Sequence, residues 1–217
     1  HIKSGSWLSA DMFIDCKGIQ VIMDGKEQKQ YAPDNNSYGG DVSAGEIIVK
    51  YTYETVGNPV TTVIVSYTID VIGNIKVDVD YTGVKGLPEL PVFGMRFLMP
   101  TAAERYTYEG LSGETYPDRM AGGIPGVYEV QGLPVTPYMV PQDCGMHMQT
   151  KWLEIVRKTS LDNTDRGERS SRLKITAEEG KHFHFPACLI RHRNWKMPCT
   201  TKNYLLPAGR WYLSWEQ

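Results

Sequence analysis

The most motif-like stretch of the sequence, Tyr108–Arg119, holds two carboxylates close together, Glu114 and Asp118. Two carboxyl groups about 5 Å apart can serve as nucleophile and acid/base when a glycosidic bond is hydrolysed. The alternative is a structural turn in which Asp118, beside Arg119, satisfies backbone groups. Sequence spacing does not fix the distance between the two carboxyl groups, so both interpretations stay open on the residues alone.

A second chemical pattern is the pair His182 and His184. Residues two apart on a strand project from the same face, so the two imidazoles could begin a zinc site. His147, His192 or a cysteine would have to complete it. We favour the alternative, two partly exposed histidines on an edge strand, and we predict no metal site in this chain.

Trp195 lies within a basic cluster. The cluster comprises Arg191, His192, Arg193 and Lys196. Such a cluster could bind phosphate, with the indole stacking on a base. However, 23 basic and 25 acidic residues give a net charge of -2, which provides no strong field for nucleic acid or an anionic membrane. We therefore predict neither partner and interpret the cluster as a solvated loop or a contact to another domain.

Other aromatic residues and glycines also have two interpretations. Tyr108, Tyr116, Tyr138 and Trp152 could line a carbohydrate groove, but in a β-sandwich such residues are more often core and interface residues. Four glycines do not fit a nucleotide-binding loop and are predicted to form turns. They are Gly110, Gly113, Gly122 and Gly123.

The elements that must position these residues are predicted to be strands. Apolar residues alternate over 47–53, 63–71 and 75–81, and Gly73-Asn74 suits a two-residue hairpin turn between the last two. Shorter apolar runs at 19–23, 93–99, 173–176 and 211–215 are separated by turn-forming residues. We find no long helix, and a strand is favoured over a helix for Lys151–Arg157. The predicted fold class is all-β.

The 217 residues are long enough for one large β domain, and we expect 1–217 to form one, with Leu87–Pro91 as an internal loop. Cys16, Cys144, Cys188 and Cys199 have no metal-type spacing and are expected to be free thiols. No apolar run reaches the ~20 residues of a membrane span, and the chain does not begin with a secretory leader. Its first residue, His1, suggests an excised domain or a processed chain.

Three ordered blocks carry a family resemblance. They are Tyr108–Arg119, Pro137–Gly145 and Trp152-Leu153. Together they resemble the C-terminal domain of the β-galactosidases of glycoside hydrolase family two. The resemblance implies a large twisted antiparallel β-sandwich of the galactose-mutarotase-like supersandwich type. It also implies that both catalytic glutamates lie on a separate barrel domain. We therefore expect no catalytic residue here and a structural role for Glu114 and Asp118.

Further expectations follow from the same resemblance. The partners would be the catalytic barrel of the same chain, which would hold any magnesium, and a galactoside substrate. No cofactor is expected in this segment. The parent enzyme would be a homo-oligomer in the cytoplasm or periplasm of a bacterium.

The resemblance also implies a role for Trp195. The family ends with a tryptophan, a nearby proline and an Ala-Gly-Arg turn, which Trp195, Pro198 and Ala208–Arg210 match. In some members this tryptophan stacks on the sugar, because an indole covers the C–H face of galactose. Trp195 is therefore the predicted substrate-binding residue. The glycine-rich run that precedes the family's tryptophan is replaced here by Leu189–Arg193.

The leading hypothesis is an accessory domain that supports the barrel and forms part of the active-site wall of a β-galactosidase. One alternative is a stand-alone carbohydrate-binding module. Another is an aldose-epimerase-like enzyme that uses His182 or His184 with a glutamate.

Overall fold

A computed structural model describes most of the chain in separate ranges. They are residues 5–7, 14–28, 43–55, 57, 59–88, 90, 93–97, 99, 101–113, 122–132, 146–158, 170–186, 204–206 and 210–216. The last two ranges are described by their backbone. The chain divides into two compact units: unit 1 comprises His1–Val92 and Ala208–Trp211, and unit 2 comprises Phe93–Pro207 and Tyr212–Gln217.

Unit 1 contains a short 3-10 helix, η1 (Gly5–Trp7), and an antiparallel sheet in the order β2-β1-β3-β4-β5. Its strands are β1 (Asp15–Met23), β2 (Lys26–Gln28), β3 (Glu46–Glu54), β4 (Thr62–Asp70) and β5 (Ile75–Thr82). These strands include the alternating segments predicted from the sequence. Because side chains alternate along a strand, the apolar set of each strand lies on one face of the sheet.

The connection between β4 and β5 differs from the predicted two-residue turn, since residues 71–74 separate the strands. The Asp70 carboxylate accepts hydrogen bonds from the backbone N–H groups of Ile72 (3.0 Å) and Asn74 (2.9 Å). It also accepts one from the Asn74 side-chain amide at 2.9 Å. This carboxylate closes a longer loop, and Gly73 supplies the positive φ of 86° that the loop requires.

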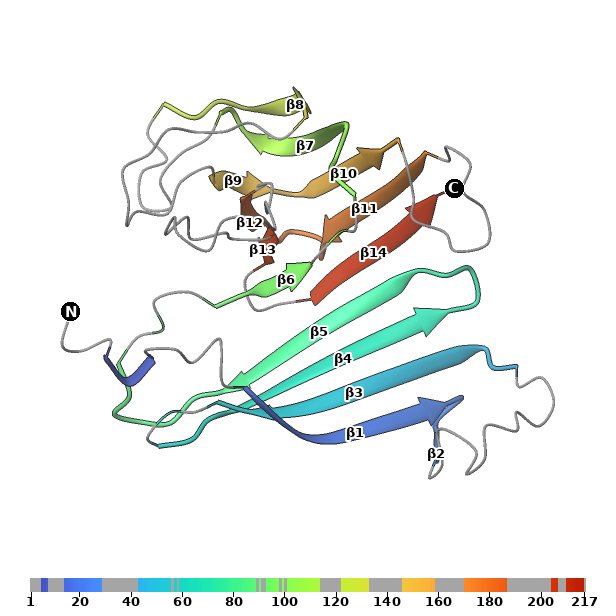
Figure 1. The fold of residues 1–217 in the computed structure, drawn as a ribbon, viewed down its shortest axis with the longest axis vertical. Coiled ribbons are helices and arrows are strands. Elements are labelled where there is room, and N and C mark those ends of the chain that lie inside the picture. Colours follow the sequence, from blue (N-terminus) through green and yellow to red (C-terminus); the bar gives the residue numbers. More distant parts are fainter. Residues whose placement is uncertain are drawn as a thin grey trace. The chain divides into compact units, whose positions relative to one another are not determined.

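Unit 2 has two layers, which Figure 1 shows in its upper half. One layer contains four neighbouring strands in the order β11-β10-β7-β8, and the other contains the pair β12-β9. The strands of these layers are β7 (Arg105–Leu111), β8 (Pro125–Gln131), β9 (Met146–Thr150), β10 (Trp152–Arg157), β11 (Ser171–Ala177) and β12 (Phe183–Pro186). A further pair consists of β6 (Met95–Phe97) and β13 (Tyr204–Leu206).

All the described strand pairings are antiparallel, so the all-β, sandwich-like fold class is confirmed. The strand predicted over Lys151–Arg157 is also confirmed, as β10. The boundary between the units follows the Leu87–Pro91 stretch at Val92/Phe93, and a second boundary falls within β14 (Arg210–Glu216). The expectation of one domain over 1–217 stays a prediction.

Candidate functional site

The first motif begins within β7, and hydrogen bonds join the two ends of the connection from β7 to β8. The strands pair as far as Leu111 and Pro125. The Ser112 N–H donates to the Ile124 carbonyl at 2.9 Å, and the Ile124 N–H donates to Ser112 Oγ at 3.1 Å. The Tyr128 hydroxyl also donates to the Ile124 carbonyl, at 2.7 Å. These bonds fix Ser112 and Ile124 at the two ends of the connection.

Gly110 was predicted to lie in a turn, and this was wrong. It is a buried residue within β7, close to the backbone of β9. A Cβ placed on it would lie 2.9 Å from the Met148 carbonyl oxygen and 3.1 Å from Thr150 Oγ1. The strands therefore approach too closely there for any side chain. Gly113 and Gly122 do lie in the connection between β7 and β8, with φ of +70° and +87°.

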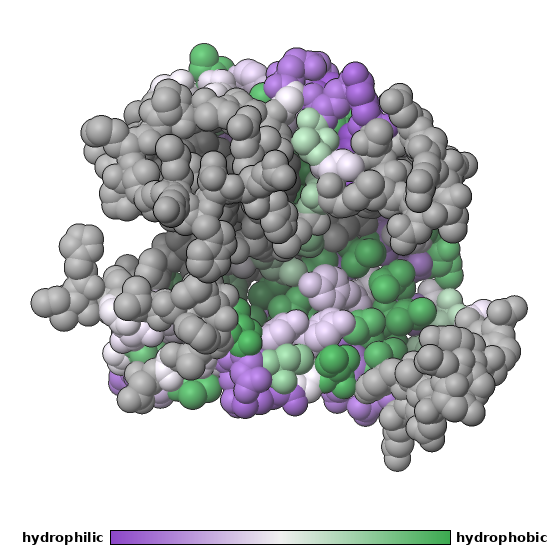
Figure 2. Space-filling view, viewed as in Figure 1, coloured by the Kyte–Doolittle hydropathy of each residue, from purple (hydrophilic) through white to green (hydrophobic). Residues whose placement is uncertain are grey.

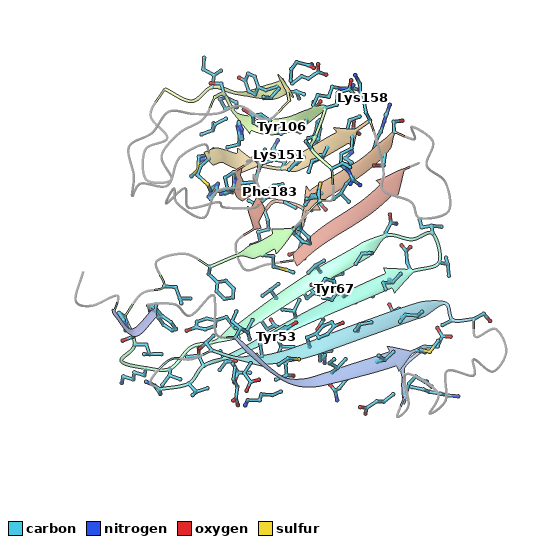
Figure 3. All side chains as sticks on the ribbon, in the orientation of Figure 1. Tyr53, Tyr67, Tyr106, Lys151, Lys158 and Phe183 are labelled. Atoms are coloured by element: carbon cyan, nitrogen blue, oxygen red, sulfur yellow. The ribbon has the colours of Figure 1, made fainter. Side chains whose placement is uncertain are left out.

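Beneath β7, the two layers of unit 2 are joined by a cluster of rings, the His147 cluster. It consists of Tyr106, Tyr108, His147 and Phe185, which are all at most 2% exposed. The His147 ring centroid lies 4.6 Å from that of Tyr108 and 4.8 Å from that of Phe185. The Tyr106 hydroxyl lies 2.8 Å from His147 Nε2. Figure 3 labels Tyr106 on β7 and Phe183 on β12, one from each layer.

Burial lowers the pKa of His147 from 6.5 to about 4, while the Gly113 backbone acts weakly in the opposite direction. The ring is therefore neutral near neutral pH. A neutral imidazole can accept the Tyr106 hydroxyl proton at Nε2, so the bond between the layers is a buried neutral hydrogen bond. Sequence inspection had considered His147 only as a zinc ligand. No sequence signal identifies its partners, since Tyr106 and Phe185 are both distant in the chain.

His182 and His184 do not join this cluster. His147 pairs in register with Phe185, so it shares a face with Phe185, whereas His184 is the adjacent residue on β12. His184 Nδ1 accepts a hydrogen bond from the Gln149 backbone N–H at 3.0 Å, and burial, followed by the charge of His182, lowers its pKa. Within the described ranges, no three His, Cys, Asp or Glu residues come together as a metal site.

On the opposite face of the β7-β10-β11 sheet, polar side chains surround the indole of Trp152. Glu109 on β7 accepts hydrogen bonds from Lys151 Nζ at 2.6 Å and from Trp152 Nε1 at 2.9 Å. Lys174 Nζ lies 5.2 Å from the centroid of the Trp152 ring. The hydrogen bond from Lys151, together with that from Trp152, lowers the pKa of the Glu109 carboxyl group. Glu109 fixes the orientation of this indole, a role that the sequence did not reveal.

The carbohydrate groove considered from the sequence would need Tyr108 and Trp152 on one face, and the structure places them on opposite faces of the sheet. Tyr108 is 1% exposed in the core, which is the favoured interpretation, whereas Trp152 is half-buried on the other face of the sheet. Tyr116 and Tyr138 lie outside the described residues, as do Glu114 and Asp118.

Trp195, the predicted substrate-binding residue, also lies outside the described residues, together with the basic cluster around it. Its role stays a prediction. Cys16 is a free, exposed thiol, and the other three cysteines lie outside the described ranges. In the part of the chain that the structure describes, no helix is long and apolar enough to cross a membrane.

These features define the class of protein, an all-β, sandwich-like domain. The His147 cluster joins two layers of strands, and one of those strands, β7, carries the start of the first motif. The family model described as β-galactosidase small chain matches residues 3–212. The chain belongs to this family, whose sandwich domain is the C-terminal domain of family-two β-galactosidases.

Several curated proteins are similar to the chain. A β-galactosidase small subunit from Latilactobacillus sakei is 61% identical over 163 residues, which is 75% of this chain and 51% of that protein. A β-galactosidase from Clostridium acetobutylicum is 41% identical over 85 residues, 39% of this chain and 10% of that protein. One from Streptococcus thermophilus is 34% identical over 141 residues, 64% of this chain and 13% of that protein. The chain therefore spans about half of the small subunit and about a tenth of the two longer enzymes.

Proposed function

We propose that this chain acts as the small subunit of a β-galactosidase, an enzyme that hydrolyses terminal β-D-galactose residues. The 61% identity to a protein named as a separate small subunit carries this proposal. The sequence alone favoured a catalytic barrel in the same polypeptide. The relative supports instead a barrel in a separate, large catalytic chain, which is the proposed partner.

In this assembly the large chain performs the chemistry. It supplies the nucleophile and the acid/base and holds any magnesium, as the resemblance to family-two β-galactosidases implies. The small subunit supports the large chain and forms one wall of its active site. Its removal would weaken the positioning of the substrate relative to the catalytic groups.

Trp195 is the residue proposed to touch the substrate. The proposal rests on the match of Trp195, Pro198 and Ala208–Arg210 to the end of the family pattern. An indole can cover the apolar C–H face of galactose while the sugar hydroxyls stay available for hydrogen bonds. Such a platform orients the ring without taking part in proton transfer.

The first experiment is complementation. The chain is produced alone, the large chain of a two-chain β-galactosidase is produced alone, and the two are mixed before hydrolysis of a chromogenic β-galactoside is measured. We expect no hydrolysis by this chain alone and a gain of activity in the mixture that saturates at a fixed ratio of the two chains. No gain together with no co-elution of the two chains would refute the small-subunit proposal.

The second experiment tests Trp195 within the active mixture. We expect Trp195→Ala to raise KM at least about tenfold, equivalent to ~1.4 kcal/mol of substrate binding. Trp152→Phe is the matched control, because Trp152 lies on a strand face and is held by Glu109. An unchanged KM in Trp195→Ala would limit the chain to a supporting role without contradicting its assembly with the large chain.

A further inference from the structure

The backbone at the end of β9 is strained, and a histidine of the neighbouring strand helps to hold it. Gln149 has a φ of 51°, a left-handed conformation that residues other than glycine rarely adopt. Its backbone N–H donates a hydrogen bond of 3.0 Å to Nδ1 of His184 on β12. Two residues later, the Lys151 N–H donates to the Glu109 carbonyl of β7 at 2.8 Å. The strained residue therefore lies between a bond to one sheet and a bond to the other.

The hydrogen bond from Gln149 requires the neutral form of the His184 ring. An imidazole nitrogen accepts a hydrogen bond only while its lone pair is free, so the proton of the neutral ring lies on Nε2. In the protonated ring both nitrogens are donors. Nδ1–H and the Gln149 N–H would then face each other as two donors, so the hydrogen bond is lost when the ring gains a proton.

The position of His184 lets it gain that proton while the protein stays folded. His184 is half-buried, whereas His147 on the core side is 2% exposed. Burial, followed by the charge of His182, lowers the pKa of His184 from its ordinary value of 6.5. Figure 3 labels Lys151 and Phe183, which lie close in the chain to the two partners of the hydrogen bond.

Among the described side chains, only His182 acts on the His184 ring through its charge. The two ring centroids lie 5.5 Å apart on β12, so a positive charge on His182 opposes protonation of His184. On β9, the titratable residue is His147, which shares the core face with Phe185. The third strand, β13, lies beside β12 and has Tyr204 as its one titratable residue, which carries no charge near neutral pH.

The ion pairs described in unit 2 lie on the other sheet. Arg105 Nε is 3.7 Å from Glu129 Oε2, and Lys151 Nζ is 2.6 Å from Glu109 Oε1. Figure 2 shows hydrophilic side chains gathered at the top of the view, where Figure 1 places β8. None of the described ion pairs includes a residue of β9 or β12, so the charge state of the His184 ring depends on pH and on its neighbour His182.

We propose that His184 is a pH-sensitive switch at the end of β9. The neutral ring holds the Gln149 N–H and helps to keep this residue in its left-handed conformation, and the protonated ring releases it. The Lys151 N–H is bonded to a backbone carbonyl, which does not titrate, so the change stops before β10. The result is a local opening of one sheet edge in acid, while unit 2 stays folded. This inference does not depend on the β-galactosidase assignment.

The test is an NMR titration of the 15N-labelled 217-residue chain from about pH 7.5 to about pH 4.5, the range in which histidine rings titrate. At neutral pH we expect a scalar coupling across the hydrogen bond between the Gln149 amide nitrogen and His184 Nδ1. This coupling should disappear with the midpoint of the His184 ring, below 6.5. The exchange protection of the Gln149 amide, corrected for the intrinsic effect of pH, should fall at least about tenfold at the same midpoint.

The same titration contains an internal control. The Lys151 amide should keep its protection through the His184 midpoint, because its acceptor is the Glu109 carbonyl. Equal loss of protection at Gln149 and Lys151 would indicate general unfolding and would overturn the proposal. A coupling that persists after the ring is protonated would also overturn it, as would ring 15N shifts that place the proton on Nδ1 at neutral pH.

Two variants separate the ring from its neighbour. His184→Phe keeps a ring of similar size but cannot accept the hydrogen bond, so protection of the Gln149 amide should be low at every pH. His182→Gln removes the charge that opposes protonation, so the midpoint shared by the His184 ring and the Gln149 amide should rise. Protection of Gln149 that is unchanged in His184→Phe, or that no longer follows the His184 midpoint in His182→Gln, would overturn the proposal.

Discussion

The buried ring of His147 should make the stability of unit 2 depend on pH in a way that one substitution removes. In the folded chain burial lowers the pKa of this ring from 6.5 to about 4. As the pH falls below 6.5, the unfolded ring gains a proton while the folded ring stays neutral. The unfolded state then binds more protons, and the free energy of unfolding decreases.

The size of the effect follows from the two pKa values. Between pH 7 and pH 4.5 the free energy of unfolding should fall by about 2.5 kcal/mol on account of this ring alone, at 1.36 kcal/mol per pKa unit. The rings around His147 are Tyr106, Tyr108 and Phe185, which carry no charge over this range and cannot offset the effect.

The assay is urea denaturation at a series of pH values for the wild type, His147→Gln and His182→Gln. Glutamine can still accept the Tyr106 hydroxyl proton but does not titrate. Between pH 7 and pH 4.5, the free energy of unfolding of His147→Gln should fall by about 2.5 kcal/mol less than that of the wild type. His182→Gln removes an exposed histidine whose charge contributes to the lowered pKa of His184, so it should flatten the profile by less than His147→Gln does. Carboxylates titrate in all three proteins and cancel in the comparison, so parallel profiles would refute burial as the cause of the shift.

Two further predictions concern β7. Gly110→Ala should destabilise the protein by about 1–3 kcal/mol in urea denaturation, because the new Cβ meets the Met148 carbonyl, whereas Gly18→Ala, with open space around its Cβ, should be tolerated. An equal effect of the two would contradict this argument. The Trp152 indole N–H resonance should titrate with Glu109 at a pH below the ordinary glutamate pKa, and Lys151→Met should move that midpoint upward. A midpoint unchanged by Lys151→Met would contradict the pairing.

The fold class could be predicted from the sequence because the information lies in local alternation. Along β3 and β4 apolar residues occupy every second position, and this pattern directly sets which face is buried. The length of a loop could not be predicted in the same way, because it depends on the hydrogen bonds of a single side chain. The Asp70 carboxylate closes a four-residue connection where a Gly73-Asn74 turn had been expected, since a carboxylate with three donors stabilises the longer loop.

The buried site could not be predicted, because its contacts join residues distant in the chain. The hydrogen bond between Tyr106 and His147 spans 41 positions, and neither residue has a distinctive neighbour pattern. Likewise, Gly110 resembles a turn residue in the sequence, and only the approach of β9 explains why no side chain fits. The motif blocks identified the family, while the predicted sugar contact at Trp195 stays a prediction.

The junction between β9 and β10 has a consequence for how the lengths of related chains can vary. Only Lys151 separates the two strands, which belong to different sheets. Gln149 has a φ of 51°, its N–H is bonded to His184, and the Lys151 N–H donates to the Glu109 carbonyl at 2.8 Å. Because Gln149 and Lys151 are fixed by geometry or by bonds to other strands, an inserted or deleted residue between or beside them would move Trp152 out of register with Glu109. Insertions and deletions among relatives should therefore be absent from 149–151.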